Sequence, residues 1–362
     1  MAEFIKGMTL CEGFYRDCAA EILHTYFPSL SFSAGLLGYG SDVLGYDDPV
    51  STDHMWGPRF YLFLTEADMG LRDEIMAAFS HHLPPVYRGY SVHFTAPDPN
   101  DNGVRHPCFR TEGPVDPLIF ITTFDAFLTE QLGTADPSAL TPEQWLAVSE
   151  HRLLSIVSGK FFHDGLHCTQ LVEKLQYYPR EVQLYLIASC WNIIASEQAF
   201  LRRTGDVGDD MGSRLICGRI AERLMRLCFL YKGVYAPYSK WFGTAFARLE
   251  IDPAIGQFLR EALAAADLEE REANLIRAMV LVAQMHNQSG LTKPVPVSVE
   301  SYYGRAIKVI FAEKWAEAAM AELSGTDVES FPPLGTFSQL SSLSDFADNP
   351  ANYPKIAAFY KA

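Results

Sequence analysis

The spacing of apolar residues changes near residue 135, and this change limits the folds open to the chain more than any other feature. Before it, short runs that alternate or are continuously apolar indicate strands, mixed with helical segments. After it, nearly every segment up to residue 323 repeats its apolar residues at helical spacing. The predicted strands are residues 31–39, 58–65, 89–95 and 118–123. The predicted helices include residues 8–27, 71–83, 147–158, 180–202, 213–231 and 256–288.

The two patterns predict two domains, which is common for a chain of 362 residues. We expect an α+β protein whose N-terminal domain, residues 1–135, is a mixed sheet with helices. An all-helical domain, residues 141–323, follows as a bundle. Thr141 opens the pattern Thr-Pro-Glu-Gln, in which Thr caps a helix, Pro takes the first helical position and Gln closes a capping box. Residues 324–362 are expected to be an irregular tail with short helices, packed on the surface.

Composition sets the broad class of the protein. The net charge of −15 argues against broad attachment to nucleic acid or anionic lipid, but it leaves room for a small phosphate pocket. The seven cysteines include no CxxC pair, which is typical of a reduced protein rather than a disulfide framework. No apolar run reaches the ~18 residues of a membrane span. We expect a soluble, cytoplasmic protein that has no membrane partner, and the apolar helical domain allows a homodimer.

A loop rich in Gly and Asp follows the predicted strand 31–39. Gly40 lets the backbone approach a phosphate because it has no Cβ, and the Ser41 hydroxyl and nearby N–H groups donate to phosphate oxygens. Asp53 stands before the next strand, where a carboxylate can hold Mg²⁺, a cation that prefers oxygen ligands. A second carboxylate at position 55 would point to the same face. Such a pair supports in-line attack on the α-phosphate of a nucleotide.

These residues resemble the signature of the nucleotidyltransferase superfamily of kanamycin nucleotidyltransferase and polymerase β. That signature is an apolar residue, Gly-Ser, a short loop, and an Asp-x-Asp pair that opens a strand. Over roughly residues 20–345 the chain is similar to one branch of the superfamily, known as a domain of unknown function. The motifs that carry this resemblance are GSDVLGYDD (40–48), STDHMWGPR (51–59), GDVGDDMGSRL (205–215), YAPYSKWFGTAF (235–246) and MHNQSGLT (285–292).

The resemblance implies a nucleotidyltransferase-like N-terminal domain and an enzyme that uses Mg²⁺ with ATP or another nucleoside triphosphate. Such an enzyme transfers the nucleotidyl group to a small-molecule acceptor, or activates a carboxylate as an ATP-dependent adenylating ligase does. Carried over to this sequence, Gly40 and Ser41 bind the phosphates, and Asp53 is both the catalytic residue and the metal ligand.

The chain departs from this pattern at Met55, which stands where the second carboxylate is expected. A thioether is a soft ligand and binds Mg²⁺ poorly. Asp47 or Asp48 of the loop can replace the missing ligand, or Asp53 can serve only to cap or bridge a turn. The alternative hypothesis is therefore a degenerate nucleotidyltransferase fold that acts as a non-catalytic nucleotide-binding or protein-interaction module. A third hypothesis is a purely structural or interaction protein.

Cationic side chains of the helical domain are candidates for a phosphate clamp. Arg219, Arg223 and Arg226 recur at i, i+4 and i+7 and form a stripe that can close over a triphosphate. The alternative is a salt-bridged helix packed against an acidic neighbour. Lys240 lies in the aromatic segment YAPYSKW. Its ammonium group is either placed beside a bound nucleotide or is exposed at a corner where aromatic residues pack. The predicted nucleotide-binding residues are Gly40, Ser41, Arg219, Arg223 and Lys240.

Two further polar groups of the helical domain have both a structural and a functional interpretation. Asp206, Asp209 and Asp210 either complement the dipole of the helix that follows them or meet a cationic substrate. His286 is either a packing residue or a residue that faces the cleft. The sequence leaves the acceptor open among an aminoglycoside, an amino acid, a nucleic-acid end and a protein hydroxyl. The acidic balance favours a cationic acceptor over nucleic acid.

Overall fold

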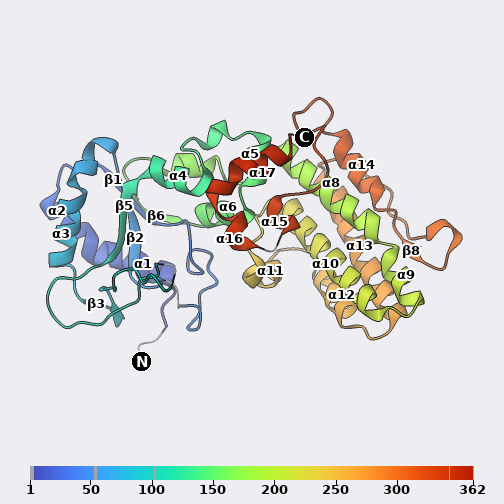
Figure 1. Ribbon diagram of the computed structural model, residues 1–362, viewed down its shortest axis with the longest axis horizontal. Helices are drawn as coiled ribbons and strands as arrows, with labels where there is room; N and C mark the ends of the chain where they lie inside the picture. The colour runs from blue at the N-terminus through green and yellow to red at the C-terminus, as the bar shows by residue number, and fades with distance from the viewer. Residues whose placement is uncertain (1–3, 53–54, 102, 342, 362) are drawn as a thin grey trace. The chain divides into compact units, whose positions relative to one another are not determined.

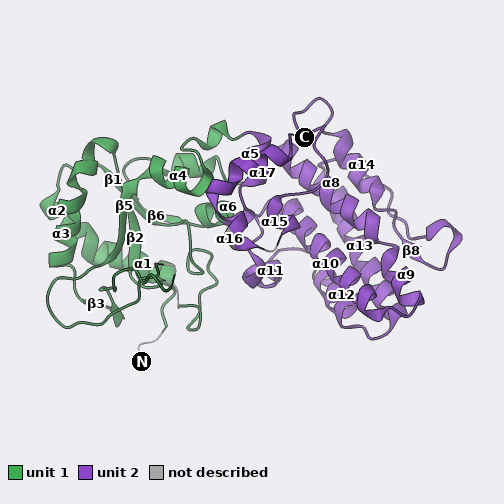
Figure 2. Cartoon of the chain, in the orientation of Figure 1, with its two compact units in different colours: residues 1–140, 152–176 green, residues 141–151, 177–362 purple. Residues whose placement is uncertain are grey.

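The computed structural model shows a mixed α+β protein, as predicted, with a four-stranded sheet in the N-terminal half and mostly helices in the C-terminal half (Figure 1). The structure describes residues 4–52, 55–101, 103–341 and 343–361. The chain forms two compact units (Figure 2). Unit 1 consists of residues 1–140 and 152–176, and unit 2 consists of residues 141–151 and 177–362. The division therefore differs from the predicted single break near residue 135, because the chain returns to unit 1 after residue 151.

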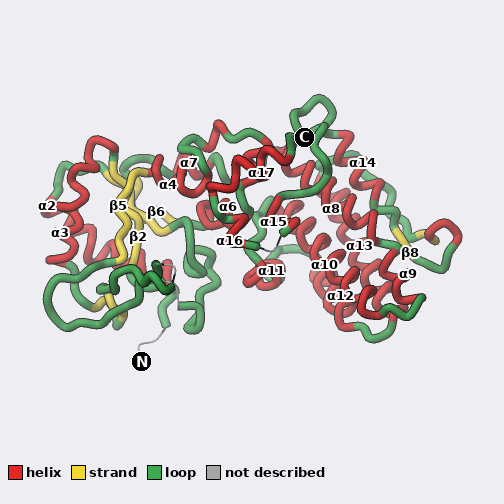
Figure 3. The backbone as a smooth tube through the Cα atoms, viewed as in Figure 1, coloured by secondary structure: helices red, strands yellow, loops and turns green. Residues whose placement is uncertain are grey.

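Unit 1 is built on a sheet with the strand order β5–β2–β1–β6, drawn in yellow in Figure 3. The central strands β1 (Phe32–Leu36) and β2 (Arg59–Leu64) are antiparallel. β6 (Lys160–Asp164) pairs antiparallel with β1, and β5 (Leu118–Thr123) pairs parallel with β2. A parallel pair needs a long crossover, and the connection from β2 to β5 contains short helices and a hairpin.

Helices cover both faces of this sheet. Phe60 of β2 makes ring contacts with Phe14 of the first helix and with Phe79 of α3. Phe63 makes ring contacts with Phe127 of α4, on the opposite face, because neighbouring strand residues point to opposite sides. β2 is therefore buried along its whole length. The helices are α1 (Gly7–Phe14), the π turn η1 (Tyr15–Ala19), α2 (Ala20–Tyr26), α3 (Arg72–His82) and α4 (Phe124–Leu132).

Two predicted features of this part of the chain differ from the structure. Residues 89–95, predicted as a strand, contain only the two-residue β4, paired with β3 in a hairpin outside the main sheet. β6 lies where helices were predicted, and Lys160 and His163 on it are exposed. The smaller elements are η2 (Glu66–Leu71), β3 (Val86–Tyr87), β4 (Tyr90–Ser91), η3 (Pro137–Ala139), α6 (Glu150–Val157) and α7 (Thr169–Glu173).

Unit 2 is a helical assembly in which α8 packs against α10 and α14, and α12 packs against α13. The buried rings of Trp191 and Trp315 join α8 to α14, with centroids 5.4 Å apart. Helix α5 begins with the predicted capping box of Thr141 and Gln144. The main helices are α5 (Pro142–Ala147), α8 (Arg180–Glu197), α9 (Phe200–Asp206), α10 (Asp210–Lys232), α11 (Ser239–Phe246), α12 (Pro253–Ala264), α13 (Leu268–Ser289) and α14 (Glu313–Ala321).

The C-terminal tail contains short helices and packs within unit 2. Its last helix lies on α5, and the Tyr360 hydroxyl donates to the Gly335 carbonyl oxygen at 2.7 Å. Among the described residues, no helix is both long enough and apolar enough to cross a membrane. The remaining elements of unit 2 are β7 (Glu300–Ser301), η4 (Tyr302–Gly304), β8 (Lys308–Val309), α15 (Phe337–Leu340), α16 (Ser344–Ala347), η5 (Pro350–Asn352) and α17 (Tyr353–Phe359).

Candidate functional site

The Gly40–Ser41 turn follows β1 and leads into the Asp-rich loop of unit 1. Gly40 has φ +107°, and a Cβ there would lie 2.2 Å from Asp42 Oδ1 and 2.6 Å from Arg59 Nη2. Glycine at this position therefore makes room for an ion pair. The Ser41 hydroxyl donates to the Ser51 carbonyl oxygen at 3.2 Å and ties the two ends of the loop together. Both turn residues are half-buried and held in place.

The ion pair beneath this turn is formed by Asp42 and Arg59. Arg59 Nη2 lies 2.8 Å and 3.0 Å from the two carboxylate oxygens, and both side chains are about 1% exposed. Nη2 also donates to the Tyr39 carbonyl oxygen, and the guanidinium carbon lies 4.1 Å from the centre of the Tyr39 ring. Asp42 therefore holds the loop on the sheet rather than pointing to a ligand.

The other carboxylates of the loop also bind protein groups. Asp47 is buried, and its Oδ2 accepts from the Gly7 N–H at 2.7 Å and from Trp56 Nε1 at 3.3 Å. Lys6 forms an ion pair with its other oxygen. Asp48 Oδ1 accepts from the N–H groups of the two residues that follow Pro49, which closes the turn. These bonds leave neither carboxylate as a ready substitute for a metal ligand.

The predicted magnesium site depends on a residue outside the described part of the chain. Asp53, the predicted catalytic residue and metal ligand, lies outside the described residues, so its role stays a prediction. Met55 is described, and its thioether is a poor Mg²⁺ ligand. Within residues 4–52, 55–101, 103–341 and 343–361, no group of three or more His, Cys, Asp or Glu side chains is placed to hold a metal ion.

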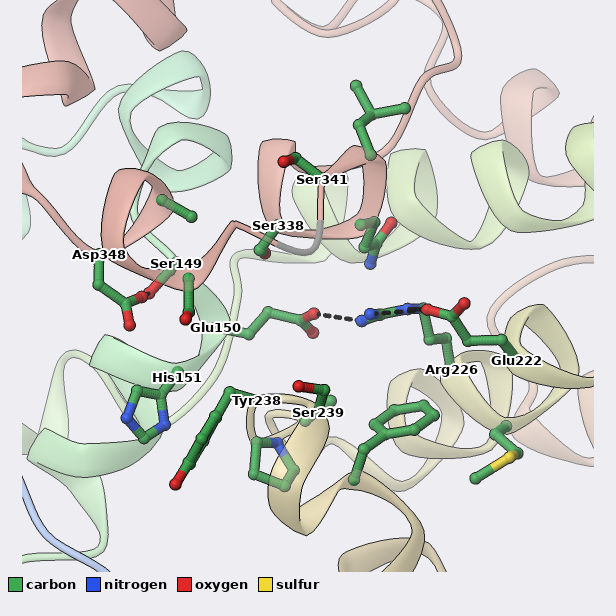
Figure 4. A pocket seen from close by; sticks show the side chains of 18 of the residues that line it. Ser149, Glu150, His151, Glu222, Arg226, Tyr238, Ser239, Ser338, Ser341 and Asp348 are labelled. Atoms are coloured by element: carbon green, nitrogen blue, oxygen red, sulfur yellow. Dashed lines mark hydrogen bonds and ion pairs between the residues drawn. The ribbon is translucent and has the colours of Figure 1, made fainter. Parts of the chain in front are cut away.

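Unit 2 contains a cavity of about 480 Å³, shown in Figure 4. Its walls are the start of α6, one face of α10, the start of α11, and tail residues 338–341, 344, 347 and 348. Glu150 extends across it toward Arg226, whereas Ser149, His151 and Tyr238 gather at the other side (Figure 4). The three arginines of the predicted stripe line this cavity. Three carboxylates also line it, those of Glu150, Glu222 and Asp348.

The three arginines have different partners. Arg219 Nη2 lies 2.6 Å from a carboxylate oxygen of Glu197. Arg226 lies between Glu150 and Glu222, at 3.0 Å from each. Arg223 donates from Nη2 to the Gln339 carbonyl oxygen at 2.9 Å. Its Nε and Nη1 are buried and have no hydrogen-bond partner among the described residues, so two donors of this guanidinium are unsatisfied.

Glu150 is a buried acid on the wall of this cavity, with 5% of its surface exposed. Burial raises its pKa above the ordinary value of 4.5, and this effect is only partly opposed by the positive charges of Arg226 and Arg223 and by the Ala236 backbone N–H. A perturbed acid beside unsatisfied donors in a cavity is typical of a binding or catalytic site. Sequence analysis did not identify this residue, because burial of a glutamate at a helix start has no local signature.

Aromatic and hydroxyl groups complete the walls. The rings of His151 and Tyr238 lie 4.7 Å apart, and Arg226 stands over the Phe242 ring at 5.0 Å. The Ser149 hydroxyl donates to Asp348. Lys240, a predicted nucleotide-binding residue, is exposed on α11 with its Nζ over the Trp241 ring at 5.1 Å, and it is not among the described residues that line the cavity.

The structural interpretation is confirmed for Asp209, Asp210 and His286, whereas Asp206 is the last residue of α9 and pairs with Arg202. Asp209 caps α10 through the Gly212 N–H, and Asp210 forms ion pairs with Arg214 and Arg271. His286 is buried between Tyr231 and Thr292, at 2.9 Å and 2.7 Å from their hydroxyls, and burial lowers its pKa to about 4.

Comparison with known proteins gives a family model for part of the chain. Residues 145–242 match the family described as "Domain of unknown function (DUF4037)". This segment is less than half of the chain, and it includes Glu150 and the three arginines of the cavity. It also agrees with the resemblance to a domain of unknown function.

A solved structure and the curated proteins add little. The crystal structure of a nucleotidyltransferase-like protein from Exiguobacterium sibiricum 255-15 aligns with 82% of this chain and 97% of its own chain. Its identity is 14% and its TM-score is 0.32, which is too distant to carry an argument. No curated protein matches the chain.

Proposed function

We propose that this chain is a nucleotidyltransferase-like protein that acts as a binding module for a nucleoside triphosphate and a small polar molecule. The Gly40–Ser41 turn is the candidate for the phosphates, and the cavity of unit 2 is the candidate for the small molecule. The observation that carries the proposal is the bonding of the loop carboxylates. Asp42, Asp47 and Asp48 all bind protein groups, so they hold the turn in shape instead of recruiting a metal.

A rigid turn of this kind supports phosphate binding without a metal. Its backbone conformation is fixed by the ion pair and by the Ser41–Ser51 hydrogen bond, so little conformational entropy is lost when an anion binds. Backbone N–H groups of the turn are the candidate donors to phosphate oxygens, because the Ser41 hydroxyl already donates to the Ser51 carbonyl oxygen.

A second candidate function is Mg²⁺-dependent transfer of a nucleotidyl group to a small molecule. The observation that favours it is the position of Asp53 in the sequence pattern. In that case Asp53 would hold the metal and the nucleotide would supply further oxygen ligands. Adenylating ligation would use the same groups.

Binding measured on two aspartate variants distinguishes the candidates. ATP, GTP, CTP and UTP are titrated calorimetrically into the wild type, Asp53→Asn and the control Asp73→Asn, an exposed residue of α3. The binding module predicts that Asp53→Asn binds one of the nucleotides within about twofold of the wild type, which is a difference below 0.5 kcal/mol. Loss of binding in Asp53→Asn but not in Asp73→Asn, with pyrophosphate release by the wild type, favours the transferase. Absence of binding to the wild type rejects both.

A further inference from the structure

The cavity of unit 2 carries groups of both charges, and we propose that it binds a small zwitterion. The phosphate or carboxylate of that molecule is bound at Arg223, and its ammonium group is bound at Glu150. The inference rests on the proposed function in one respect only, since it identifies the small molecule that accompanies the nucleotide. The cavity itself lies within unit 2.

The anionic end is assigned from the partners of the arginines. Arg219 is held by Glu197, and Arg226 is held by two carboxylates. Among the described residues, the hydrogen-bond partner of Arg223 is a neutral carbonyl oxygen, and its Nε and Nη1 are buried without an acceptor. Buried donors without acceptors cost free energy, and an oxygen of a phosphate or carboxylate would satisfy one of them with a charge-assisted hydrogen bond.

The cationic end is assigned from the carboxylates. Arg226 is paired with both Glu150 and Glu222, and Arg223 also places a positive charge near Glu150. An anionic group bound at Arg223 would offset that charge and leave the two glutamates and Arg226 with one excess negative charge. Glu150 is 5% exposed, so water does not fully screen that charge. A ligand ammonium beside Glu150 would balance it, and the nearby rings of Tyr238 and Phe242 suit a cation or its methylene groups.

The same balance excludes a triphosphate from this cavity. The described residues of its walls include three arginines and three carboxylates, whose formal charges sum to zero. A triphosphate would bring several negative charges beside Glu150, Glu222 and Asp348, whereas Arg219 and Arg226 are already in ion pairs with carboxylates. A zwitterion adds no net charge, and about 480 Å³ is ample for a small polar molecule.

The test uses two zwitterions and their halves, without nucleotide. Phosphoethanolamine and 3-aminopropyl phosphate are titrated calorimetrically into the full chain, with inorganic phosphate and ethanolamine as the separate ends. The variants are Arg223→Gln, Arg223→Lys and Glu150→Gln. The controls are Arg214→Gln on the same helix and Glu270→Gln, neither of which lines the cavity. Circular dichroism establishes that each variant is folded.

The proposal predicts that at least one zwitterion binds more tightly than either half by about tenfold or more. Arg223→Gln should weaken that binding about tenfold or more, and Arg223→Lys should restore part of it. Glu150→Gln should remove the advantage of the zwitterion over phosphate, and the controls should change nothing. If Glu150→Gln does not fold, the two Arg223 variants decide.

Two results would overturn the proposal. One is absence of binding for both zwitterions, and the other is phosphate that binds as tightly as they do, which would indicate a simple anion site. Neither result touches nucleotide binding, which is measured separately. A protein that binds a zwitterion but no nucleotide would retain this site and lose the proposed function.

Discussion

Each unit contains a buried arginine–carboxylate pair, and the two pairs differ in their surroundings. Arg59 and Asp42 of unit 1 are each about 1% exposed, with the Tyr39 ring against the guanidinium and no space for a Cβ at Gly40. Arg226 and Glu150 of unit 2 lie at a similar distance, but on the wall of a cavity.

Unsatisfied donors alone do not separate a binding site from a structural pair. Arg59 Nε and Nη1 are buried without hydrogen-bond partners, as the same atoms of Arg223 are. Arg223 lines a cavity that can admit an acceptor, whereas the first pair is enclosed by protein. The comparison teaches that the space beside a charged group, and not the group itself, decides whether it is available to a ligand.

The largest effect is expected from Arg59→Met. This change leaves Asp42 buried and unpaired, which should cost about 3–5 kcal/mol of stability in unit 1. Hydrogen exchange of peptides from β1 and β2 measures unit 1 by itself. Arg16→Met, which removes an exposed ion pair with Asp17, is the control and should leave the stability of unit 1 nearly unchanged. Equal effects of the two variants would remove the distinction between a structural pair and a surface pair.

Gly40→Ala should have the next largest effect. The added Cβ would overlap Asp42 and Arg59 in a left-handed backbone conformation, so unit 1 should lose about 2 kcal/mol or more. Gly45→Ala is a matched control in the same loop, with φ +71° and no atom within 4 Å of the new Cβ. It should cost about 1 kcal/mol or less. A larger loss in Gly45→Ala than in Gly40→Ala would contradict the packed turn.

Glu150→Gln tests the Arg226–Glu150 pair through the pH dependence of stability. Because the folded protein raises the pKa of Glu150 above 4.5, the folded state keeps a proton that the unfolded chain has already released. The folded state then binds more protons, and the contribution of Glu150 to stability falls as pH rises above 4.5. Denaturant unfolding across pH 4 to 8 should show wild-type stability falling relative to Glu150→Gln over this window. Wild-type stability that rises relative to Glu150→Gln as pH increases would contradict a pKa raised by burial.

Arg219→Gln should have the smallest effect on stability. Arg219 is about half exposed, and its pair with Glu197 is a surface pair, so the loss should be below about 1 kcal/mol. Thermal unfolding of the variant beside Arg226→Gln, which breaks the buried pair, measures the contrast. A larger loss of stability in Arg219→Gln than in Arg226→Gln would contradict the assignment of Arg219 to a surface pair and of Arg226 to a buried pair.

The fold could be predicted from the sequence wherever one residue pattern decides the element. The strands at 31–39, 58–65 and 118–123 and the capping box at Thr141 were found in this way. β6 was missed because it is half exposed and carries no clear alternation. The predicted helix 256–288 is two helices, since Asp267 caps a new one after a break.

The candidate site was only partly accessible to sequence analysis. The pattern drew attention to Gly40 and the arginine stripe, but it could not show that Asp42 is paired with Arg59. The cavity joins residues 149–151, helix α10 and tail residues 338–341, 344, 347 and 348, which are brought together by tertiary packing. Glu150 and Asp348 had no motif that would have marked them.

The most direct test of the account is the affinity of the wild type for its best nucleoside triphosphate in Mg²⁺ and in EDTA. The loop carboxylates bind protein groups, so the account places no metal ion at this turn. The dissociation constant should therefore agree within about twofold between the two conditions. A loss of affinity of about tenfold or more in EDTA would contradict the account, because it would show that nucleotide binding depends on a metal ion.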